Sequence, residues 1–239
     1  MTPIDAELLR RALPGRRIEY HAIVDSTMRA AAGLPLGSVI LAEEQTAGQG
    51  RHGHSWHSEP GTGIYLSIVA RPAPLVTMAL GLATAEAITT ATGIVCDLRW
   101  PNDVLIGDKK AAGILAQVSD GAAIGGIGIN VNHAGFPPEL AQIATSLRLE
   151  SGREWPRTDL LVALIPAIDS FLALPAESIL QLFTRASSYA RGRRVVVQQK
   201  EGDIYGITAG LTDAGYLKVR QDNGTDAVII AGGVRAASA

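Results

Sequence analysis

The sequence predicts an α+β domain that is followed by a small all-β domain. Over roughly the first 188 residues, apolar segments with helical spacing alternate irregularly with short apolar segments of strand length. After Arg191 only short strand-like segments remain, and turns that contain glycine separate them. The length of 239 residues accommodates one large domain and one small one. We therefore expect domains at residues 1–188 and 189–239.

Five helices are expected in the first domain. The first ends at Pro14–Gly15, because proline cannot continue a helix. Asp25 or Ser26 can cap the second helix, and Gly93 ends a long helix that is rich in alanine and leucine. The fourth has apolar residues at the spacing of an amphipathic helix. The expected ranges are 4–13, 27–33, 75–92, 158–174 and 176–187.

Seven strands are expected beside these helices, and a polar loop dense in glycine, residues 46–63, separates the second strand from the third. Gly107–Asp108 and Asp120–Gly121 have the composition of hairpin turns. The expected strands are 17–24, 38–43, 64–69, 94–100, 103–106, 111–119 and 123–130. The second domain has short strands at 195–197, 204–207, 216–219 and 227–230.

Charge and cysteine content exclude several classes of protein. The chain has 21 Lys and Arg against 23 Asp and Glu, and this lack of a basic excess disfavours a non-specific nucleic-acid binder. The single cysteine, Cys96, cannot form an intramolecular disulfide and fits a reducing compartment. The N-terminus does not resemble a signal peptide, and apolar stretches are interrupted before 18 residues. We expect a cytoplasmic enzyme with no membrane span.

Gly48, Gly50 and Gly53 form a G-x-G-x-x-G pattern in the long loop. A dinucleotide site is not expected there, because no helical periodicity follows the third glycine. The backbone N–H groups could instead wrap an anion, with Arg51 supplying a fixed positive charge. The alternative is a plain surface loop.

Two further clusters have polar residues at strand ends. In the segment Arg99–Asp103, the proline predicts a bend that exposes Asn102 and Asp103. These two side chains could bind a hydroxyl, an amine or a metal-bound water. The alternative is that they only form a turn. The adjacent Lys109 and Lys110 point to opposite faces of a strand. Lys110 leads into an apolar run, and an inward lysine is costly unless it meets an anion.

The three loop histidines, His52, His54 and His57, are candidates for metal ligands only by residue type. No carboxylate or second histidine pair supports them, so we expect solvated side chains. Cys96 has no evident histidine partner and is expected to be inert.

These motifs, taken in order, resemble those of the biotin–protein ligases. The resemblance covers nearly the whole chain and implies a mixed β-sheet with helices packed on one side, as in class II synthetases, and a C-terminal SH3-like β-barrel. The matching segments are 25–27, 44–53 with Trp56, 100–103, 110–115 and 128–130, followed by 206–233.

The resemblance implies an ATP-dependent ligase that makes biotinyl-5′-AMP and transfers biotin to a lysine of a biotin carboxyl carrier domain. Lys110, Arg51 and Asp103 would be catalytic, and Mg²⁺ would accompany ATP near Asn102 and Asp103. Biotin-binding residues would be Ser26, Thr27, Met28, Gln45, Gln49, Gly50, Arg51, Lys110 and Gly113. ATP- and adenylate-binding residues would be Gly48, Gly53, Trp56, Asn102, Gly128 and Asn130.

The sequence departs from the family pattern in three places. Arg99 stands where many members have lysine, and Gln49 and His52 replace loop arginines, so this loop carries less charge. About 17 residues precede the first expected strand, too few for a helix-turn-helix domain. The resemblance is therefore to a ligase without a DNA-binding role, and a homodimer is left open.

Two other functions are alternatives to a biotin–protein ligase. A lipoate–protein ligase or octanoyltransferase shares the catalytic fold, but the loop, Trp56 and the C-terminal domain favour biotin. A non-enzymatic module that senses biotin or a nucleotide does not explain why Lys110, Arg51 and Asp103 occur together.

Overall fold

Two β-sheets organise the chain in the computed structural model, which describes residues 2–199 and 202–237. The larger sheet has the strand order β1-β2-β3-β7-β6-β5-β4. The β1 and β2 strands are parallel and the other neighbours are antiparallel, so the predicted mixed sheet is confirmed. Its strands are β1 (Ile18–Val24), β2 (Val39–Gln45), β3 (Gly63–Ala70), β4 (Asp97–Arg99), β5 (Asp103–Ile106), β6 (Lys109–Ser119) and β7 (Ala122–Asn130).

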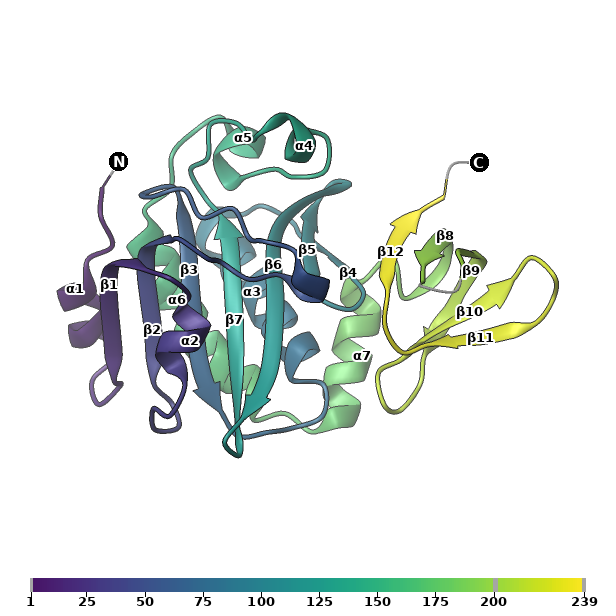
Figure 1. Ribbon diagram of the computed structural model, residues 1–239, viewed down its shortest axis with the longest axis horizontal. Coiled ribbons are helices and arrows are strands. Elements are labelled where there is room, and N and C mark those ends of the chain that lie inside the picture. The colour runs from purple at the N-terminus through teal and green to yellow at the C-terminus, as the bar shows by residue number, and fades with distance from the viewer. Residues whose placement is uncertain (1, 200–201, 238–239) are drawn as a thin grey trace.

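The long helices pack on one face of this sheet, as predicted. Figure 1 shows α3 and α6 behind the strands, while the short α2 lies in front of them. Met28 and Ala31 of α2 pack against Ile40, Val69 and Ile124 in a small core of their own. The helices are α1 (Ala6–Ala12), α2 (Thr27–Ala31), α3 (Val76–Thr92), α4 (Pro138–Ala141), α5 (Leu147–Ser151), α6 (Arg157–Leu172) and α7 (Ala176–Ala186).

Glycines in β7 let helices approach the sheet closely from both sides. A Cβ on Gly125 would lie 2.4 Å from Leu80 Cδ1 of α3, and one on Gly126 would lie 2.9 Å from Met28 Sδ of α2. Consecutive residues of a strand face opposite sides, so each glycine serves a different helix. A side chain at either position would push a helix away from the sheet.

The structure differs from the expected elements at several points, and it adds to the small domain a fifth strand that was not predicted, β12 (Gly233–Ala236). The fourth strand is only Asp97–Arg99: residues 94–96 lie outside any strand, and the strand ends before Trp100 and Pro101, whose peptide bond is cis. The short helices α4 and α5 were not predicted, since four or five residues are too few to show a helical period.

The smaller sheet is antiparallel with the order β11-β10-β9-β8-β12, which confirms the predicted small all-β unit of SH3-like type. Its strands are β8 (Arg191–Gln198), β9 (Ile204–Leu211), β10 (Leu217–Gln221), β11 (Asp226–Ile229) and β12 (Gly233–Ala236). Val195, Leu217 and Val219 are fully buried and belong to the same hydrophobic core as the larger sheet. The two sheets are therefore packed together.

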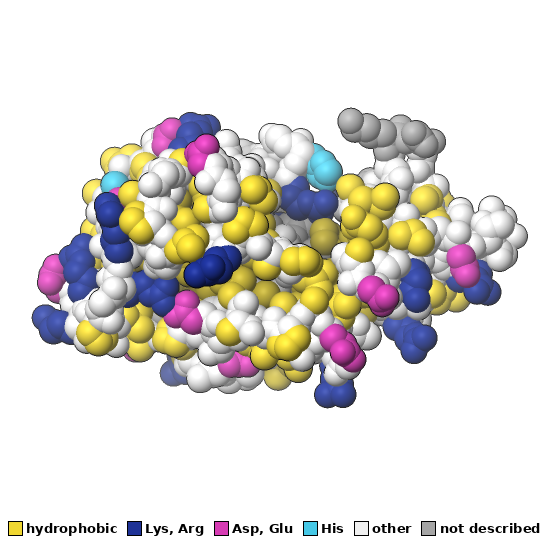
Figure 2. Space-filling model, turned by 90° about the horizontal axis from the view of Figure 1, so that it is seen from below, with side chains coloured by type: hydrophobic (Ala, Val, Ile, Leu, Met, Phe, Trp, Pro, Cys, Tyr) yellow, Lys and Arg dark blue, Asp and Glu magenta, His cyan; other side chains and the backbone are white. Residues whose placement is uncertain are grey.

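Charged side chains are mixed on the surface. Figure 2 shows lysine and arginine interspersed with aspartate and glutamate on one face, without a large patch of one sign. Among the described residues, every helix is too short or too polar to cross a lipid bilayer.

Trp100 connects the two sheets, and its replacement tests this contact. Its indole Nε1 donates a hydrogen bond of 2.8 Å to the backbone oxygen of Gly215, and Trp100 is buried. Trp100→Phe keeps most of the packing but leaves this carbonyl oxygen without its donor. We expect the free energy of unfolding to fall by about 1–3 kcal/mol. Urea titration followed by circular dichroism measures this, and an unchanged midpoint would contradict it.

Candidate active site

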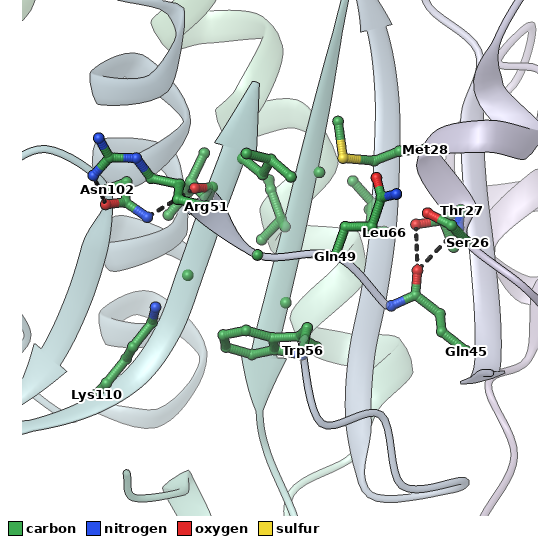
Figure 3. A pocket seen from close by; sticks show the side chains of 17 residues that line it. Ser26, Thr27, Met28, Gln45, Gln49, Arg51, Trp56, Leu66, Asn102 and Lys110 are labelled. Carbon is green, nitrogen blue, oxygen red and sulfur yellow. Dashed lines mark hydrogen bonds between the residues drawn. The ribbon is translucent and has the colours of Figure 1, made fainter. Parts of the chain in front are cut away.

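A cavity lies on the α2 side of the large sheet, where β2, β3, β6 and β7 meet the long loop between β2 and β3 (Figure 3). It brings together twelve of the residues that the sequence singled out, although they are far apart in the chain. These are Ser26, Thr27, Met28, Gln45, Gln49, Gly50, Arg51, Trp56, Asn102, Lys110, Gly113 and Gly128. The remaining lining is Leu66, Ile114, Leu115, Gly126 and Ile127.

One end of the cavity is polar and organised by Gln45. Its Oε1 accepts hydrogen bonds from the backbone N of Thr27 at 2.9 Å and from Thr27 Oγ1 at 3.1 Å. Its Nε2 donates to Ser58 Oγ at 3.0 Å. Ser67 Oγ donates to Thr27 Oγ1 at 2.8 Å, so the position of Thr27 is fixed from two sides.

Ser26 has a buried hydroxyl with no partner among the described residues. It precedes α2 as the N-cap residue, but its side chain makes no capping hydrogen bond. Buried polar groups are nearly always hydrogen-bonded in native proteins. The Ser26 hydroxyl is therefore available to a ligand in the cavity.

The floor of the cavity requires two glycines. A Cβ on Gly128 would lie 2.3 Å from Trp56 Cε2, and one on Gly113 would lie 2.8 Å from Trp56 Cζ3. These residues face each other on β7 and β6. The indole of Trp56 thus lies flat against the sheet, where only glycine leaves space for it.

The other end of the cavity is charged, and Asp103 holds two cations there. Its Oδ1 is 2.6 Å from Lys110 Nζ, and its Oδ2 is 2.7 Å from Arg99 Nη2. Burial raises the pKa of Asp103, but the combined attraction of Lys110 and Arg99 is larger and lowers it below the usual range. Lys110 also lies 5.2 Å from the centre of a Trp56 ring. Asp103 was expected to be exposed, yet these two cations cover it.

Arg51 joins the loop to both sheets. It donates to Asn102 Oδ1 at 3.1 Å and to the backbone oxygen of Gly232 at 3.4 Å. Burial lowers the pKa of Arg51, and the nearby Asp103 raises it; arginine nevertheless remains charged in proteins. The loop thereby places a fixed positive charge beside the cavity.

Four predicted residues do not line the cavity. Gly48 packs behind the loop, where a Cβ would lie 2.8 Å from Trp56 O, and Gly53 has positive φ with open space around it. Asn130 Nδ2 donates to Thr145 O at 3.0 Å. Asp103 acts on the cavity only through Lys110 and Arg99.

The cavity residues that sequence reasoning missed are all apolar or glycine: Leu66, Ile114, Leu115, Gly126 and Ile127. They look like ordinary strand residues, and only the glycine inside β7 gave a signal. Cys96 lies outside the cavity, and burial raises its pKa to about 12, so it is no nucleophile near neutral pH.

Asp103→Asn tests whether this carboxylate holds the charged end together. The variant leaves two half-buried cations without their partner, and we expect the free energy of unfolding at pH 7 to fall by about 1.5–3 kcal/mol. Because the folded-state pKa is lowered, the contribution of Asp103 is complete above about pH 4 and disappears as the pH falls through the lowered value. Urea titrations should therefore show a smaller difference from the wild type at pH 3 than at pH 7.

Asp108→Asn is the matched control, since Asp108 makes an exposed ion pair with Arg193. We expect it to change stability by less than about 1 kcal/mol. A difference between wild type and Asp103→Asn that is the same at both pH values would contradict the role of the carboxylate charge.

Family models match both parts of the chain in order. Residues 20–133 match the biotin/lipoate A/B protein ligase family, and residues 191–234 match the biotin protein ligase C-terminal domain. The fold and the cavity thus define a ligase of the biotin/lipoate type.

Individual relatives narrow this class. The biotin–[acetyl-CoA-carboxylase] ligase of Mycobacterium tuberculosis is 33% identical, with 97% of this chain and 94% of that protein covered. The bifunctional ligase/repressor BirA of Bacillus subtilis is 32% identical, with 90% of this chain and 73% of that protein covered. The structure of the Aquifex aeolicus biotin protein ligase with biotin and ATP has a TM-score of 0.84 at 29% identity, covering 92% of this chain and 99% of that one. The chain belongs to the biotin protein ligase family.

Proposed function

We propose that the protein joins biotin to ATP, giving biotinyl-5′-AMP and pyrophosphate, and then transfers the biotinyl group to a lysine of a carboxylase carrier domain. The observation that carries this proposal is the distribution of polar, apolar and charged residues along this cavity. The polar side chains of Ser26, Thr27 and Gln45 lie at one end, an apolar wall in the middle, and Lys110 and Arg51 at the other end. This order matches a small acid with a polar ring, an aliphatic chain and a carboxylate.

The polar end suits the ureido ring of biotin. The Ser26 hydroxyl, which has no partner in the described part of the chain, and the Thr27–Gln45 pair offer hydrogen bonds to its carbonyl and N–H groups. Met28 and Ile127 line the apolar section that would contact the sulfur-containing ring and the chain. The carboxylate would then lie toward Lys110, at the opposite end of the cavity.

In the first step, a carboxylate oxygen of biotin attacks the α-phosphorus of ATP, and pyrophosphate leaves. Both reactants are anions, so their repulsion raises the barrier. The ammonium of Lys110 and the guanidinium of Arg51 offset this repulsion and stabilise the charge of the transition state. Asp103 is a positioning residue in this scheme, because it holds Lys110.

Magnesium was expected near Asn102 and Asp103, but the side-chain oxygens that would bind it already have other partners. Both oxygens of Asp103 contact cations. Asn102 Oδ1 accepts from Arg51, and its Nδ2 donates to Ile114 O at 3.0 Å. These residues therefore do not fit a Mg²⁺ site in this arrangement.

In the second step, the neutral amine of the carrier lysine attacks the acyl carbon of the adenylate, forming an amide as AMP leaves. The mixed anhydride must be kept from water until then. The loop between β2 and β3 carries Arg51 and Trp56 into the cavity and is in position to shield it. The contact of Arg51 with Gly232 suggests that the C-terminal unit supports the loop.

We further propose residues 1–188 as the catalytic domain and 189–239 as the C-terminal domain. The single cysteine supports a cytoplasmic location, since the chain gains nothing from an oxidising compartment.

The deciding experiment is transfer of labelled biotin to a purified biotin carboxyl carrier domain in the presence of ATP and Mg²⁺. We expect label on the carrier and release of one pyrophosphate per transfer. Calorimetric titration with biotin and with lipoate separates the alternative acyl substrates. Binding of lipoate without biotin would replace the proposal by a lipoate ligase, and binding of biotin without pyrophosphate release would indicate a sensor.

A further inference from the structure

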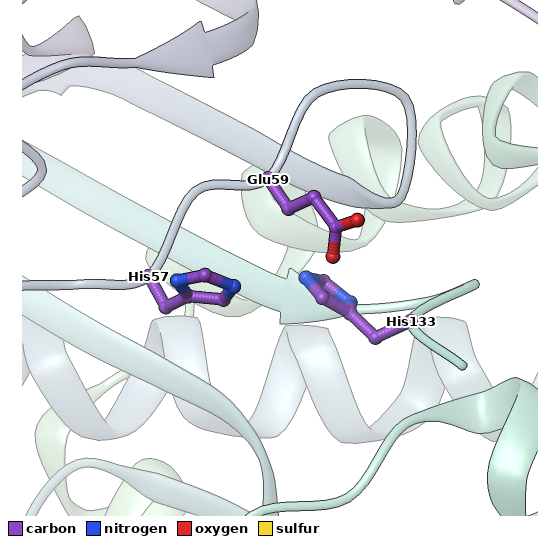
Figure 4. Close-up of side chains that lie close together, drawn as sticks. All are labelled: His57, Glu59 and His133. Carbon is purple, nitrogen blue, oxygen red and sulfur yellow. The ribbon is translucent and has the colours of Figure 1, made fainter. Parts of the chain in front are cut away.

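Three side chains from two separate segments meet beyond the end of β7, outside the cavity. His57 and Glu59 belong to the loop between β2 and β3, and His133 follows the last residue of β7 by three positions. Their possible metal-binding atoms all lie within 4.8 Å of one another. Figure 4 shows a ring nitrogen of His133 and the carboxylate of Glu59 turned toward each other, with His57 beside them.

Hydrogen bonds around Thr62 assign the protonation of His133. The Thr62 hydroxyl donates its single hydrogen to the backbone oxygen of Glu59 at 2.9 Å. It must therefore act as the acceptor in its 2.9 Å contact with His133 Nε2. The ring then carries its hydrogen on Nε2, and Nδ1 has a free lone pair.

His133 Nδ1 is buried and has no hydrogen-bond partner within the described part of the chain. The residue as a whole is 0% exposed. Burial is the main reason that the pKa of His133 falls to about 4, so the ring is neutral near pH 7. The lone pair of His133 Nδ1 faces the carboxylate of Glu59, which offers no hydrogen. A cation between the two groups would satisfy both.

The buried histidine is also held rigidly. Ser146 Oγ donates to its backbone oxygen at 2.7 Å, and the ring of Phe136 stacks on it with a centroid distance of 5.1 Å. His57 and Glu59 are exposed, so their side chains can move toward a shared ligand. The fixed ring of His133 and the two movable side chains can therefore come close enough to share one metal ion.

We propose that His57, Glu59 and the Nδ1 of His133 bind one first-row transition-metal dication, such as Zn²⁺. Two imidazole nitrogens and one carboxylate are a ligand set that Zn²⁺ accepts, with water completing a tetrahedron at bond lengths of about 2.0–2.2 Å. The hydrogen bond between Nε2 and Thr62 is of the kind that orients metal-binding histidines. Such an ion would tie the segment after Trp56 to the end of β7.

Calorimetric titration of the untagged full-length protein with ZnCl₂, without nucleotide or Mg²⁺, tests the site. We expect one equivalent of Zn²⁺ to bind. The exposed residues can be changed without disturbing the core, and His57→Ala or Glu59→Gln should each weaken binding by about tenfold or more. Thr62→Val removes the orienting hydroxyl and should weaken binding by about 10–100-fold.

The matched control is His54→Ala, which removes an exposed histidine of the same loop that lies outside the cluster. It should leave the affinity unchanged. Failure to observe saturable binding near one equivalent would overturn the proposal, as would equal weakening by His54→Ala and His57→Ala. Neither result bears on the ligase reaction, which the carrier assay tests separately.

Discussion

Replacing Lys110 with alanine should lower the rate of biotinyl-5′-AMP formation by about 10²–10³. Lys110 is the cation that Asp103 holds at the charged end of the cavity, 2.6 Å from its Oδ1. Without it, the repulsion between the biotin carboxylate and the α-phosphate loses its principal counter-charge. Pyrophosphate release in the presence of biotin and ATP measures this step directly.

Lys109→Ala provides the control, because the neighbouring lysine is exposed on the opposite face of β6. It should keep the wild-type rate. In Lys110→Ala, Asp103 retains its ion pair with Arg99, so we expect the protein to remain folded. Near-normal pyrophosphate release from folded Lys110→Ala would disprove the assignment of this lysine.

Arg51→Gly should release the adenylate before the carrier arrives. We expect Arg51 to contact the anionic phosphate of the intermediate from the loop that covers the cavity. A hydrogen bond to a charged group contributes about 1.5–3 kcal/mol, so release should accelerate by about 10–100-fold. Free adenylate acylates exposed lysines without selection, and labelled biotin would then appear on an unrelated protein such as serum albumin.

Arg71→Gly serves as the comparison, since Arg71 is an exposed arginine that follows β3 outside the cavity. It should leave labelling confined to the carrier domain. Strict selectivity for the carrier in Arg51→Gly would count against the retaining role of the loop, whatever its effect on the overall rate.

The sequence predicted much of the candidate site because the chemistry is concentrated in short motifs. The loop glycines with Arg51 and the inward position of Lys110 follow from spacing and alternation alone. In the structure Lys109 is exposed and Lys110 is half-buried, in agreement with that alternation. The family resemblance rested on the same motifs, and the comparisons confirmed it.

Contacts between distant segments could not be predicted in this way. Periodicity identifies a strand but not its neighbour in the sheet. Here β7 lies between β3 and β6, and this order brings Gly128 under Trp56 and His133 beside His57. The histidines of the loop seemed isolated in sequence, although the fold brings a second histidine, His133, to His57 and to Glu59 of the same loop.

The sequence by itself determined the class of fold and the identity of the charged groups, and it predicted that the glycine-rich loop binds an anion. Tertiary structure decided how those groups act. It paired Asp103 with both Lys110 and Arg99, left the Ser26 hydroxyl without a partner among residues 2–199 and 202–237, and linked Trp100 to Gly215 across the two sheets. The physical reason is that hydrogen bonds and ion pairs depend on distances of a few ångströms, which only the packing of remote strands sets.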